Sequence, residues 1–242
     1  MQFEGKYKVG VREIGKDNKL SNIGMLGFLE EVASEHSALA GYGINDIPKT
    51  RRVWLLMDWK LKIMERPIYG DVLTIKTWSR LPSSCPVAYT YRDFEIYVEN
   101  KLVAIATSKW VMIDADTGRI VKITDEMIKG YDSEDKHVFE EKEIEKLISD
   151  EEFRNKVCYE VRKADIDMNK HVHNLNYLNI AYEAMPEEIY ENKEFPNVRI
   201  MYKKQIKFGE KVNVLYTCKN GKHKFCIKSE NNKVLHAIIE LN

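Results

Sequence analysis

The sequence predicts an α+β protein built from two similar halves, and three observations support this prediction. The segment ERPIYGDVLTIKTW (65–78) resembles KQIKFGEKVNVLYTC (204–218): in both, an aromatic residue, a glycine and an acidic residue precede alternating apolar positions. The segment ENKLVAIATSKWVMID (99–114) resembles NNKVLHAIIELN (231–242), again a turn followed by a β-rich run. A helical pattern precedes these segments in each half, so the order of helix and then strands occurs twice.

Each half is expected to begin with one helix. In residues 22–43 the helical spacing is carried by Met25, Leu29, Val32 and His36, and the glycines at 41 and 43 end the helix. In residues 173–186 the same spacing is carried by Leu175, Leu178, Tyr182 and Met185, and Pro186 ends the helix.

Strand-rich segments joined by tight turns follow each helix. Turn residues occur at 99–101 and 116–118, and Asn220-Gly221 is suited to a type I′ hairpin. A helix followed by an antiparallel sheet must bury its apolar stripe against that sheet, which gives one helix layer and one sheet layer per half. Two such copies in one chain form an internal pseudo-dimer.

The domain boundaries follow from this repeat. A chain of 242 residues can hold two cores of about 100–120 residues each. We expect an N-terminal domain at residues 1–123 and a C-terminal domain at residues 158–242. Residues 124–157 are dense in charge and poor in β-branched runs, which is typical of a solvated, partly helical linker.

Composition excludes several classes of partner. The 38 basic and 38 acidic residues cancel, so no net field attracts nucleic acid or an anionic membrane. The N-terminal stretch lacks the pattern of a signal peptide, and no stretch reaches the ~18 apolar residues of a membrane span, so we expect a cytoplasmic protein. No C-x-x-C pair occurs, so buried or half-buried thiols are expected for Cys85, Cys158, Cys218 and Cys226.

Residues 165–173 carry polar groups at strictly alternate positions. In an extended strand successive side chains point to opposite faces, so one face would hold Asp165, Asp167, Asn169, His171 and His173. Such alternation is also typical of a solvated edge strand. However, Asp, Asn and His are poor strand formers, and they accept, donate and relay protons near neutral pH. The stripe is therefore a candidate reaction centre.

The stripe leads into the start of the second predicted helix, near His173 or Asn174. A helix start offers unpaired N–H groups and about half a positive charge, which can bind a developing oxyanion. The loss of one such donor typically costs ~10²–10³ in rate. The corresponding stretch of the first half, GKDNKLSNIGM (15–25), offers Asp17 and Asn18 but no histidine. A single site would therefore belong to the second half.

A metal site is the alternative interpretation of the same residues. His171 and His173 with an aspartate nearby could bind zinc or iron. The sequence has no obvious further cluster of ligands, so we expect neither a metal nor another cofactor. Sensitivity to chelators would decide between the two interpretations.

The second half resembles the acyl-acyl carrier protein thioesterase family. The resemblance is carried by a D-x-N-x-H-V-x-N motif, a following tyrosine and a helix that ends in E-x-x-P, here Asp167, Asn169, His171, Val172, Asn174, Tyr177 and Glu183 to Pro186. In the first half the helix, TWSR (77–80) and SKWVMIDADTGRIVKI (108–123) resemble the same family. The similarity extends over nearly the whole chain.

The resemblance implies a fold of two tandem hotdog domains, each a long helix wrapped by an antiparallel sheet. It implies hydrolysis of the thioester between a fatty acyl chain and the phosphopantetheine arm of acyl carrier protein. It assigns catalysis to Asp167, Asn169 and His171, with Asp167 either as the nucleophile or as the base that activates water. Asn169 and His171 would orient Asp167 and the reacting group.

The fourth catalytic position of the family differs in this chain. The family's Y-[RK]-[RK]-E-C stretch is here Tyr202 to Ile206, so Gln205 stands at the acidic position and Ile206 at the cysteine position. A cysteine nucleophile at that point is excluded, and Gln205 cannot accept a proton as a glutamate could. We expect that Asp167 or His171 takes that role and that Gln205 holds a water by its amide.

The resemblance gives the first half the task of housing the acyl chain. Candidate lining residues are Met25, Phe28, Leu29, Trp54 and Trp59, although residues of this kind are more often plain core. Acyl carrier proteins are acidic, so candidate docking residues are Lys49, Arg51, Arg52, Lys203, Lys204 and Lys207. A homodimer is also compatible with the sequence.

Three other functions are compatible with the same scaffold. An acyl-CoA thioesterase would cleave the same bond on a different carrier. A non-catalytic acyl-binding protein is possible because of Gln205, but a binder has no need for Asp167, Asn169 and His171 together. A hotdog dehydratase is disfavoured, because its His-x-x-x-x-Pro-Gly pattern is absent.

Overall fold

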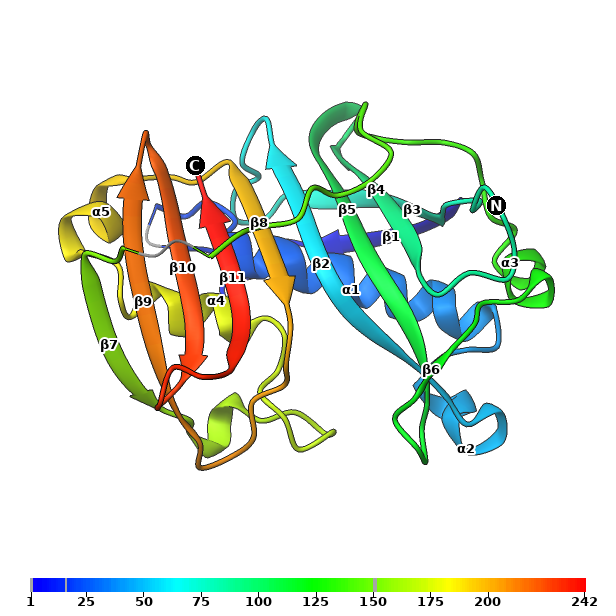
Figure 1. The fold of residues 1–242 in the computed structure, drawn as a ribbon. Helices are drawn as coiled ribbons and strands as arrows, with labels where there is room; N and C mark the ends of the chain where they lie inside the picture. Colours follow the sequence, from blue (N-terminus) through cyan, green and yellow to red (C-terminus); the bar gives the residue numbers. More distant parts are fainter. Residues whose placement is uncertain (1, 16, 150–151) are drawn as a thin grey trace. The chain divides into compact units, whose positions relative to one another are not determined.

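The computed structural model describes residues 2–15, 17–149 and 152–242. The chain divides into two compact units, Met1–Ile144 and Glu145–Asn242. Each unit is an antiparallel sheet with helices, which agrees with the predicted α+β class (Figure 1). The division falls inside the predicted linker at 124–157, of which residues 150 and 151 lie outside the described residues.

The first unit contains one long helix and six strands. Its sheet has the order β1-β3-β4-β5-β2, and β6 pairs with β5. The strands are β1 (Phe3–Lys8), β2 (Arg52–Ile63), β3 (Val72–Ser79), β4 (Thr90–Val98), β5 (Lys101–Asp114) and β6 (Ile120–Val121). The helices are α1 (Asn22–Leu39), a 3-10 turn η1 (Ile44–Asp46), α2 (Ile47–Thr50) and α3 (Asp125–Gly130).

Helix α1 confirms the helix predicted for residues 22–43 and shows why it forms there. The hydroxyl of Ser21 accepts a hydrogen bond from Gly24 N at 2.9 Å and so caps the helix start. The buried face carries Met25, Leu26, Leu29, Val32, Ala33 and His36. Burial of each large apolar side chain contributes about 1.5–3 kcal/mol. After Leu39 the chain turns at Gly41, where φ is +79°.

The second unit has five strands and shorter helices. Its sheet has the order β8-β11-β10-β9-β7. The strands are β7 (Asn155–Glu160), β8 (Asn197–Tyr202), β9 (Lys211–Lys219), β10 (Lys222–Ser229) and β11 (Leu235–Leu241). The helical elements are a 3-10 turn η2 (Lys163–Asp165), α4 (Asn176–Tyr182) and α5 (Glu187–Asn192). The predicted hairpin at Asn220-Gly221 joins β9 to β10, with positive φ at both residues.

The second predicted helix is shorter than expected. Residues 173–175 form a turn, α4 begins at Asn176 and it ends at Tyr182, whereas the prediction covered residues 173–186. Pro186 does interrupt the helical pattern, but a separate helix, α5, follows it directly. The buried face of α4 carries Tyr177, Leu178, Ile180 and Ala181, of which the predicted spacing included Leu178 alone, so both the face and the length of this helix were predicted incorrectly.

The predicted linker is largely a packed segment of the first unit. Only α3 is helical among its described residues, and residues 131–144 run over the sheet face that α1 does not cover. The indole of Trp78 donates to Lys136 O at 2.9 Å, and Arg80 donates to Lys142 O at 2.7 Å. We call residues 131–144 the strap. The expectation of a solvated linker is wrong for residues 131–144. Their charged side chains suggested exposure to solvent, whereas the backbone of this segment contacts the sheet.

The strap covers a polar cluster on that face of the sheet. Arg80 forms a bidentate ion pair with Asp93, at 2.6 and 2.8 Å, and both side chains are buried. Thr107 completes the cluster by accepting from Arg80 at 3.0 Å. A buried ion pair is tolerated only when its remaining hydrogen bonds are satisfied, and the Lys142 carbonyl in the strap supplies one of them.

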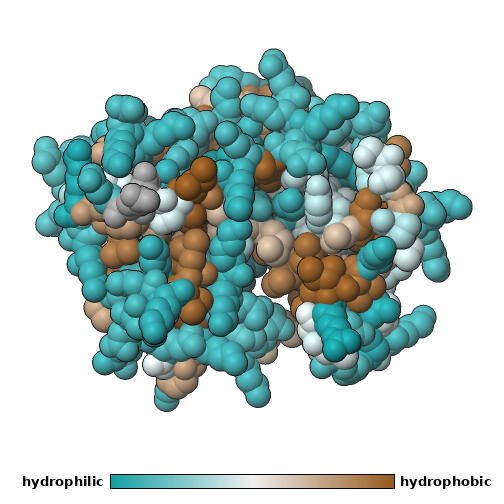
Figure 2. All heavy atoms as spheres, in the orientation of Figure 1, coloured by the Kyte–Doolittle hydropathy of each residue, from teal (hydrophilic) through white to brown (hydrophobic). Residues whose placement is uncertain are grey.

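Both units leave some apolar surface exposed. Figure 2 shows apolar side chains gathered over β5 near β6, where Ile120 is 62% exposed. In the second unit, Ile148 is 76% exposed and Met168 is 71% exposed. Among the described residues, no helix combines the length and the apolar character that a membrane crossing requires.

Candidate active site

The predicted polar stripe folds as a tight hairpin. Asp167 N donates to His171 O at 2.9 Å, and Lys170 N donates back to Asp167 O at 3.0 Å. Lys170 has φ +63°, in the left-handed region that allows the chain to reverse. The expectation of an extended strand is therefore wrong, because the chain turns between the polar residues. The turn nevertheless brings Asp167, Asn169 and His171 together.

Asp167 is held within this hairpin by its neighbours. Its Oδ1 accepts hydrogen bonds from Asn169 N at 2.8 Å and from His171 N at 3.4 Å. Its Oδ2 accepts from the Asn169 side-chain amide at 3.4 Å. The carboxylate is half-buried, so water and a substrate can still reach it. Asn169 thus fixes the orientation of the Asp167 side chain.

The ring of His171 is available for further contacts. Its Nδ1 is buried and has no hydrogen-bond partner among the described residues. A buried imidazole nitrogen without a partner is costly, so such an atom is often completed by a ligand or water. His171 is therefore placed beside Asp167 by the backbone, with one buried ring nitrogen that is unpaired among the described residues.

The first unit contains the same hairpin with different side chains. Gly15 N donates to Lys19 O at 2.8 Å, as Asp167 N donates to His171 O. Asn18 and Lys170 both have positive φ at the equivalent point, +56° and +63°. The positions of Asp167, Asn169 and His171 are occupied in the first unit by Gly15, Asp17 and Lys19.

Both hairpins are attached to their units in the same way. Leu20 N donates to Pro67 O at 2.7 Å, and Val172 N donates to Ile206 O at 2.8 Å. Pro67 and Ile206 precede the two repeated glycine turns that the sequence comparison aligned. The internal repeat is therefore structural, and the carboxylate, amide and imidazole set occurs only in the hairpin of the second unit.

Gln205 lies near the hairpin but not beside the Asp167 carboxylate. His171 pairs with Lys207, and this antiparallel register places Gln205 level with His173. Gln205 is exposed. Among the described residues no hydrogen bond joins it to Asp167, Asn169 or His171. The structure thus gives no contact that supports a catalytic role for Gln205.

The internal repeat indicates what the Gln205 position can reach. Arg66 is its equivalent, two residues before the paired position of the first unit. Arg66 donates to Leu20 O at 2.9 Å and to Asn22 Oδ1 at 2.8 Å, at the start of α1. A side chain at this position therefore reaches the end of the hairpin and the start of the helix.

The two outer members of the stripe support the hairpin. Asp165 is 3% exposed and accepts hydrogen bonds from Tyr159 Oη at 2.7 Å and from Arg162 N at 2.8 Å. Burial alone would raise the pKa of Asp165, but these hydrogen bonds and the Arg162 guanidinium outweigh it and lower the pKa. His173 Nδ1 accepts from Leu175 N at 3.3 Å.

The expected oxyanion site at the helix start is wrong. Helix α4 begins at Asn176 rather than at 173 or 174 and has seven residues. Its first N–H groups are already used: Asn176 N donates to His173 O at 2.9 Å and Leu178 N donates to Leu175 O at 3.1 Å. The sequence could not show this, because the turn before α4 carries no capping signal.

Two tyrosines that had no predicted role tie this region together. Tyr177 Oη accepts from Ile206 N at 3.2 Å, and Tyr202 Oη donates to Asn174 O at 3.0 Å. Burial raises the pKa of Tyr177, so its hydroxyl stays protonated. Their rings pack edge to face at 5.2 Å. Alternation and motif spacing carry no signal for such contacts between distant segments.

The residues expected to line an acyl pocket belong to the packed interior of the first unit. Met25, Leu29 and Trp59 are fully buried, and Trp59 packs on Phe94 at 5.4 Å. The Trp54 indole donates to the hydroxyl of Tyr131 at 2.7 Å. Phe28 lies against Tyr7. A role for these five residues in acyl binding stays a prediction.

The candidate docking residues differ in how much free charge they offer. Arg51 is paired with Asp116, and Arg52 is paired with Asp114 at 2.9 Å. Lys49, Lys203, Lys204 and Lys207 are exposed. Lys204 also lines a pocket of about 750 Å³ with Lys211 and His236. The two arginines are thus partly neutralised, whereas the lysines keep exposed charge.

The described residues contain no cluster of three or more His, Cys, Asp or Glu side chains that could hold a metal ion. His171 and His173 lie on the same hairpin, but their ring nitrogens share no third ligand there.

Comparison with known proteins identifies the family. The model of the acyl-ACP thioesterase N-terminal domain matches residues 1–131, and the model of the C-terminal domain matches residues 148–240. Oleoyl-acyl carrier protein thioesterase 1 of Arabidopsis thaliana is 26% identical over 90% of this chain. Palmitoyl-acyl carrier protein thioesterase of Cuphea hookeriana is 25% identical over 84% of it. The chain covers 64% and 51% of these two relatives.

Solved structures show the same fold. An acyl-ACP thioesterase from Bacteroides thetaiotaomicron superimposes with a TM-score of 0.85 at 18% identity, over 99% of this chain and 96% of that one. A 12:0-ACP thioesterase from Umbellularia californica also gives 0.85, at 19% identity over 100% and 96%. These similarities confirm the predicted fold of two tandem hotdog domains. Together with the two family models, which span most of the sequence, they show that this chain belongs to the acyl-ACP thioesterase family.

Proposed function

We propose that this protein hydrolyses the thioester of fatty acyl-acyl carrier protein and releases a free fatty acid and the carrier. The observation that carries the proposal is the hairpin of the second unit, which orients the Asp167 carboxylate through Asn169 and places His171 beside it. Family membership supports the same activity, because the relatives named above are thioesterases of acyl carrier protein.

Asp167 acts on the thioester carbonyl in this proposal. As a base it takes a proton from water, which then attacks the carbonyl carbon; as a nucleophile it forms a transient anhydride that water opens. In either route the carrier's thiol leaves with one proton and the acyl group gains a hydroxyl from water. The hydrogen bonds to Oδ1 and Oδ2 keep the carboxylate in one orientation, which reduces the cost of reaching the reactive geometry.

His171 stabilises the charge that develops on the carbonyl oxygen. Its ring has an uncommitted nitrogen and lies across the hairpin from Asp167. His171 thus takes the role in oxyanion stabilisation that the sequence assigned to the start of α4, because the N–H groups there are already bonded within the turn. A positioned donor of this kind typically contributes ~10²–10³ in rate.

Acyl carrier protein is the proposed partner, and the exposed lysines at 49, 203, 204 and 207 are the proposed contacts for its acidic surface. Lys207 pairs through its backbone with His171, whereas Lys203 and Lys204 lie outside this pairing, so substitutions of these two should affect binding of the carrier rather than the chemical step. Location in the cytoplasm and formation of a homodimer stay predictions.

A direct assay distinguishes this function from its two alternatives. The protein is incubated with acyl-acyl carrier protein and with acyl-CoA over a range of chain lengths, and free thiol and fatty acid are measured. We expect a higher kcat/KM for the carrier protein substrates at every chain length that is cleaved. A higher kcat/KM for acyl-CoA would favour an acyl-CoA thioesterase, and binding without turnover would favour an acyl-binding protein.

A further inference from the structure

A second group of reactive side chains lies at the far end of β9, away from the hairpin. Cys218 on β9 and His223 on β10 face each other in the sheet, with Sγ 3.8 Å from Nε2 of the imidazole. The hydroxyl of Tyr216 lies 2.9 Å from Nδ1 of the same ring, and Lys193 Nζ lies 3.3 Å from Nε2. A nucleophile, a base and a group that orients the base are thus in contact.

The base of this group is held firmly. His223 is 1% exposed and packs against the rings of Phe195 and Tyr216. Burial, together with the charge of Lys193, lowers the pKa of His223, so the ring is neutral near pH 7 and can accept a proton. Cys218 itself is only half-buried, so a small molecule can reach its sulfur.

The other three cysteines have different surroundings. Cys226 is fully buried. Cys85 donates to Ile123 O, and burial raises the pKa of its thiol. Cys158 is exposed on β7, but among the described residues no imidazole or ammonium group is hydrogen-bonded to it. Within the described part of the chain, Cys218 alone among the four cysteines is partly exposed and has an imidazole beside its sulfur. The most exposed thiol, Cys158, is therefore not the thiol that we expect to be the most reactive.

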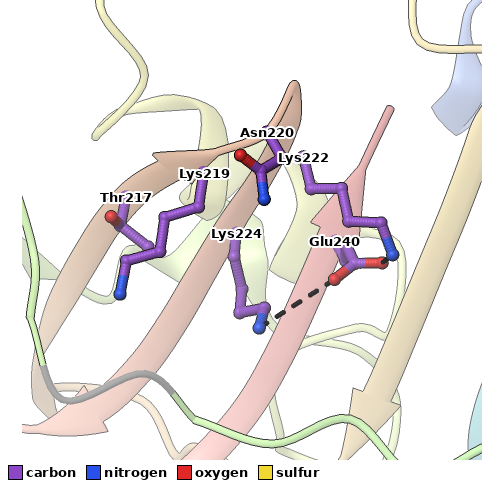
Figure 3. Close-up of a pocket in the computed structure, with 6 residues that line it drawn as sticks. All are labelled: Thr217, Lys219, Asn220, Lys222, Lys224 and Glu240. Carbon is purple, nitrogen blue, oxygen red and sulfur yellow. Dashed lines mark ion pairs between the residues drawn. The ribbon is translucent and has the colours of Figure 1, made fainter.

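The same hairpin carries a positively charged pocket on its opposite face. Because side chains alternate along a strand, the neighbours of Cys218 and His223 point away from them. Figure 3 shows the resulting pocket of about 280 Å³, lined by Thr217, Lys219, Asn220, Lys222, Lys224 and Glu240. Glu240 pairs with Lys222 at 3.4 Å and Lys224 at 3.9 Å, so two of the three lysines share one carboxylate. This charge favours anionic donors near the hairpin.

We propose that Cys218 is a nucleophilic thiol that takes up an acyl group from acyl thioesters, with His223 as its base. This proposal rests on the proposed function in one respect, namely that the acyl donor is a thioester. The thiol proton passes to Nε2 of His223, and Sγ forms a bond to the thioester carbonyl carbon. The bond between that carbon and the donor's sulfur breaks, and the departing thiolate takes the proton from His223. The product is an acyl-cysteine, and no oxidant or cofactor is consumed.

This thiol site is separate from the Asp167 site. Cys218 is seven residues along β9 from Lys211, where the strand leaves the glycine turn, a span of about 23 Å in an extended strand. Figure 1 shows the β9–β10 turn and the 163–175 segment at opposite ends of the second unit's sheet. Acylation of Cys218 is therefore a modification of the protein, distinct from turnover at the hairpin.

The test compares the reactivity of two thiols with a single reagent. The full-length protein is treated with iodoacetamide, and modification at each cysteine is followed by peptide mass spectrometry. We expect Cys218 to react about tenfold faster than Cys158, although Cys158 is more exposed, because the His223 imidazole beside Cys218 can take up the thiol proton during the reaction. Equal rates, or faster reaction at Cys158, would overturn the proposal.

A second measurement follows acylation itself. The protein is incubated with decanoyl-CoA, and its intact mass is compared with that of Cys218→Ser and of the matched control Cys158→Ser. We expect one decanoyl adduct on the wild type and on Cys158→Ser, and none on Cys218→Ser. An adduct that persists in Cys218→Ser, or no adduct on the wild type, contradicts the proposal.

A milder variant tests the role of the base. Replacement of buried His223 could unfold the unit, so Tyr216→Phe is used, which removes only the hydroxyl next to Nδ1. We expect several-fold slower alkylation of Cys218 and an unchanged rate at Cys158. An unchanged rate at Cys218 would argue against His223 as its base. Hydrolysis of acyl-acyl carrier protein is measured on the same samples. Cys218→Ser should leave it intact, so failure of the thiol site and failure of the proposed function remain distinguishable.

Discussion

At the scale of single residues, neighbouring aspartates in the hairpin of the second unit have different tasks. Asp165 is buried and committed to Tyr159 and to the Arg162 backbone, so it holds the hairpin in place. Asp167, two residues later, is half-buried and bonded only within its own turn. The same residue type is structural at one position and available for chemistry at the other because of its contacts.

A buried histidine in the first unit predicts how stability depends on pH. Burial, with the charge of Arg92, lowers the pKa of His36 from 6.5 to about 3, and Arg92 lies 2.7 Å from its Nδ1. Below pH 6.5 the unfolded chain therefore takes up a proton that the folded chain refuses until about pH 3. Stability should fall with decreasing pH across this window, by about 1.4 kcal/mol per unit from this group.

The measurement is urea unfolding of the wild type and His36→Gln at about pH 6.5 and about pH 4.5. The variant should be less stable at the higher pH because it loses the packed ring, and it should lose about 2–3 kcal/mol less than the wild type on acidification. Equal losses in the two proteins would show that His36 does not carry the pH dependence.

Residue-scale prediction succeeded where a motif specified side chains and failed where a contact depended on distant segments. The grouping of Asp167, Asn169 and His171 followed from the motif, although through a turn and not a strand. The partner of His223 lies on the neighbouring strand and that of Tyr177 on the segment before β9, and no local pattern encodes them.

At the scale of elements, the two helices show the limits of apolar spacing. Helix α1 has a capping serine and a continuous buried face, so its extent was predictable. Helix α4 has no side-chain cap at its start, and turns before and after it shorten it. Spacing therefore identified the buried face of α1 but not that of α4, whose ends depend on hydrogen bonds made by the backbone.

Close packing at the start of α1 gives a prediction about one glycine. A Cβ at Gly24 would lie 2.4 Å from Glu13 O, the carbonyl that accepts from Ser21 N. Gly24→Ala should destabilise the protein by about 1–3 kcal/mol even though alanine favours helices. Gly130→Ala is the matched control, since its Cβ would lie 3.5 Å from the nearest atom. Thermal unfolding measures both, and a Gly24→Ala variant as stable as the wild type would contradict the packing argument.

At the scale of the whole molecule, one architecture occurs twice along the chain, and the hairpin of one copy carries the set of Asp167, Asn169 and His171. The hairpins of the two units share their backbone hydrogen bonds, their positive φ residue and their link to a glycine turn. The repeat was visible in the sequence because both glycine turns have the same pattern of an aromatic residue, a glycine and an acidic residue. The strap was not predictable, because its hydrogen bonds to the sheet use backbone carbonyls, which carry no signal in the sequence.

The difference between the two hairpins provides the most direct test of the proposed function. The measurement is kcat/KM for hydrolysis of acyl-acyl carrier protein by Asp167→Ala and by Asp17→Ala, which removes the aspartate on the hairpin of the first unit, at the position of Asn169. We predict a loss of about 10²–10⁴ for Asp167→Ala and nearly wild-type activity for Asp17→Ala. If Asp167→Ala and His171→Ala both retain wild-type activity, the chemistry does not take place at this hairpin.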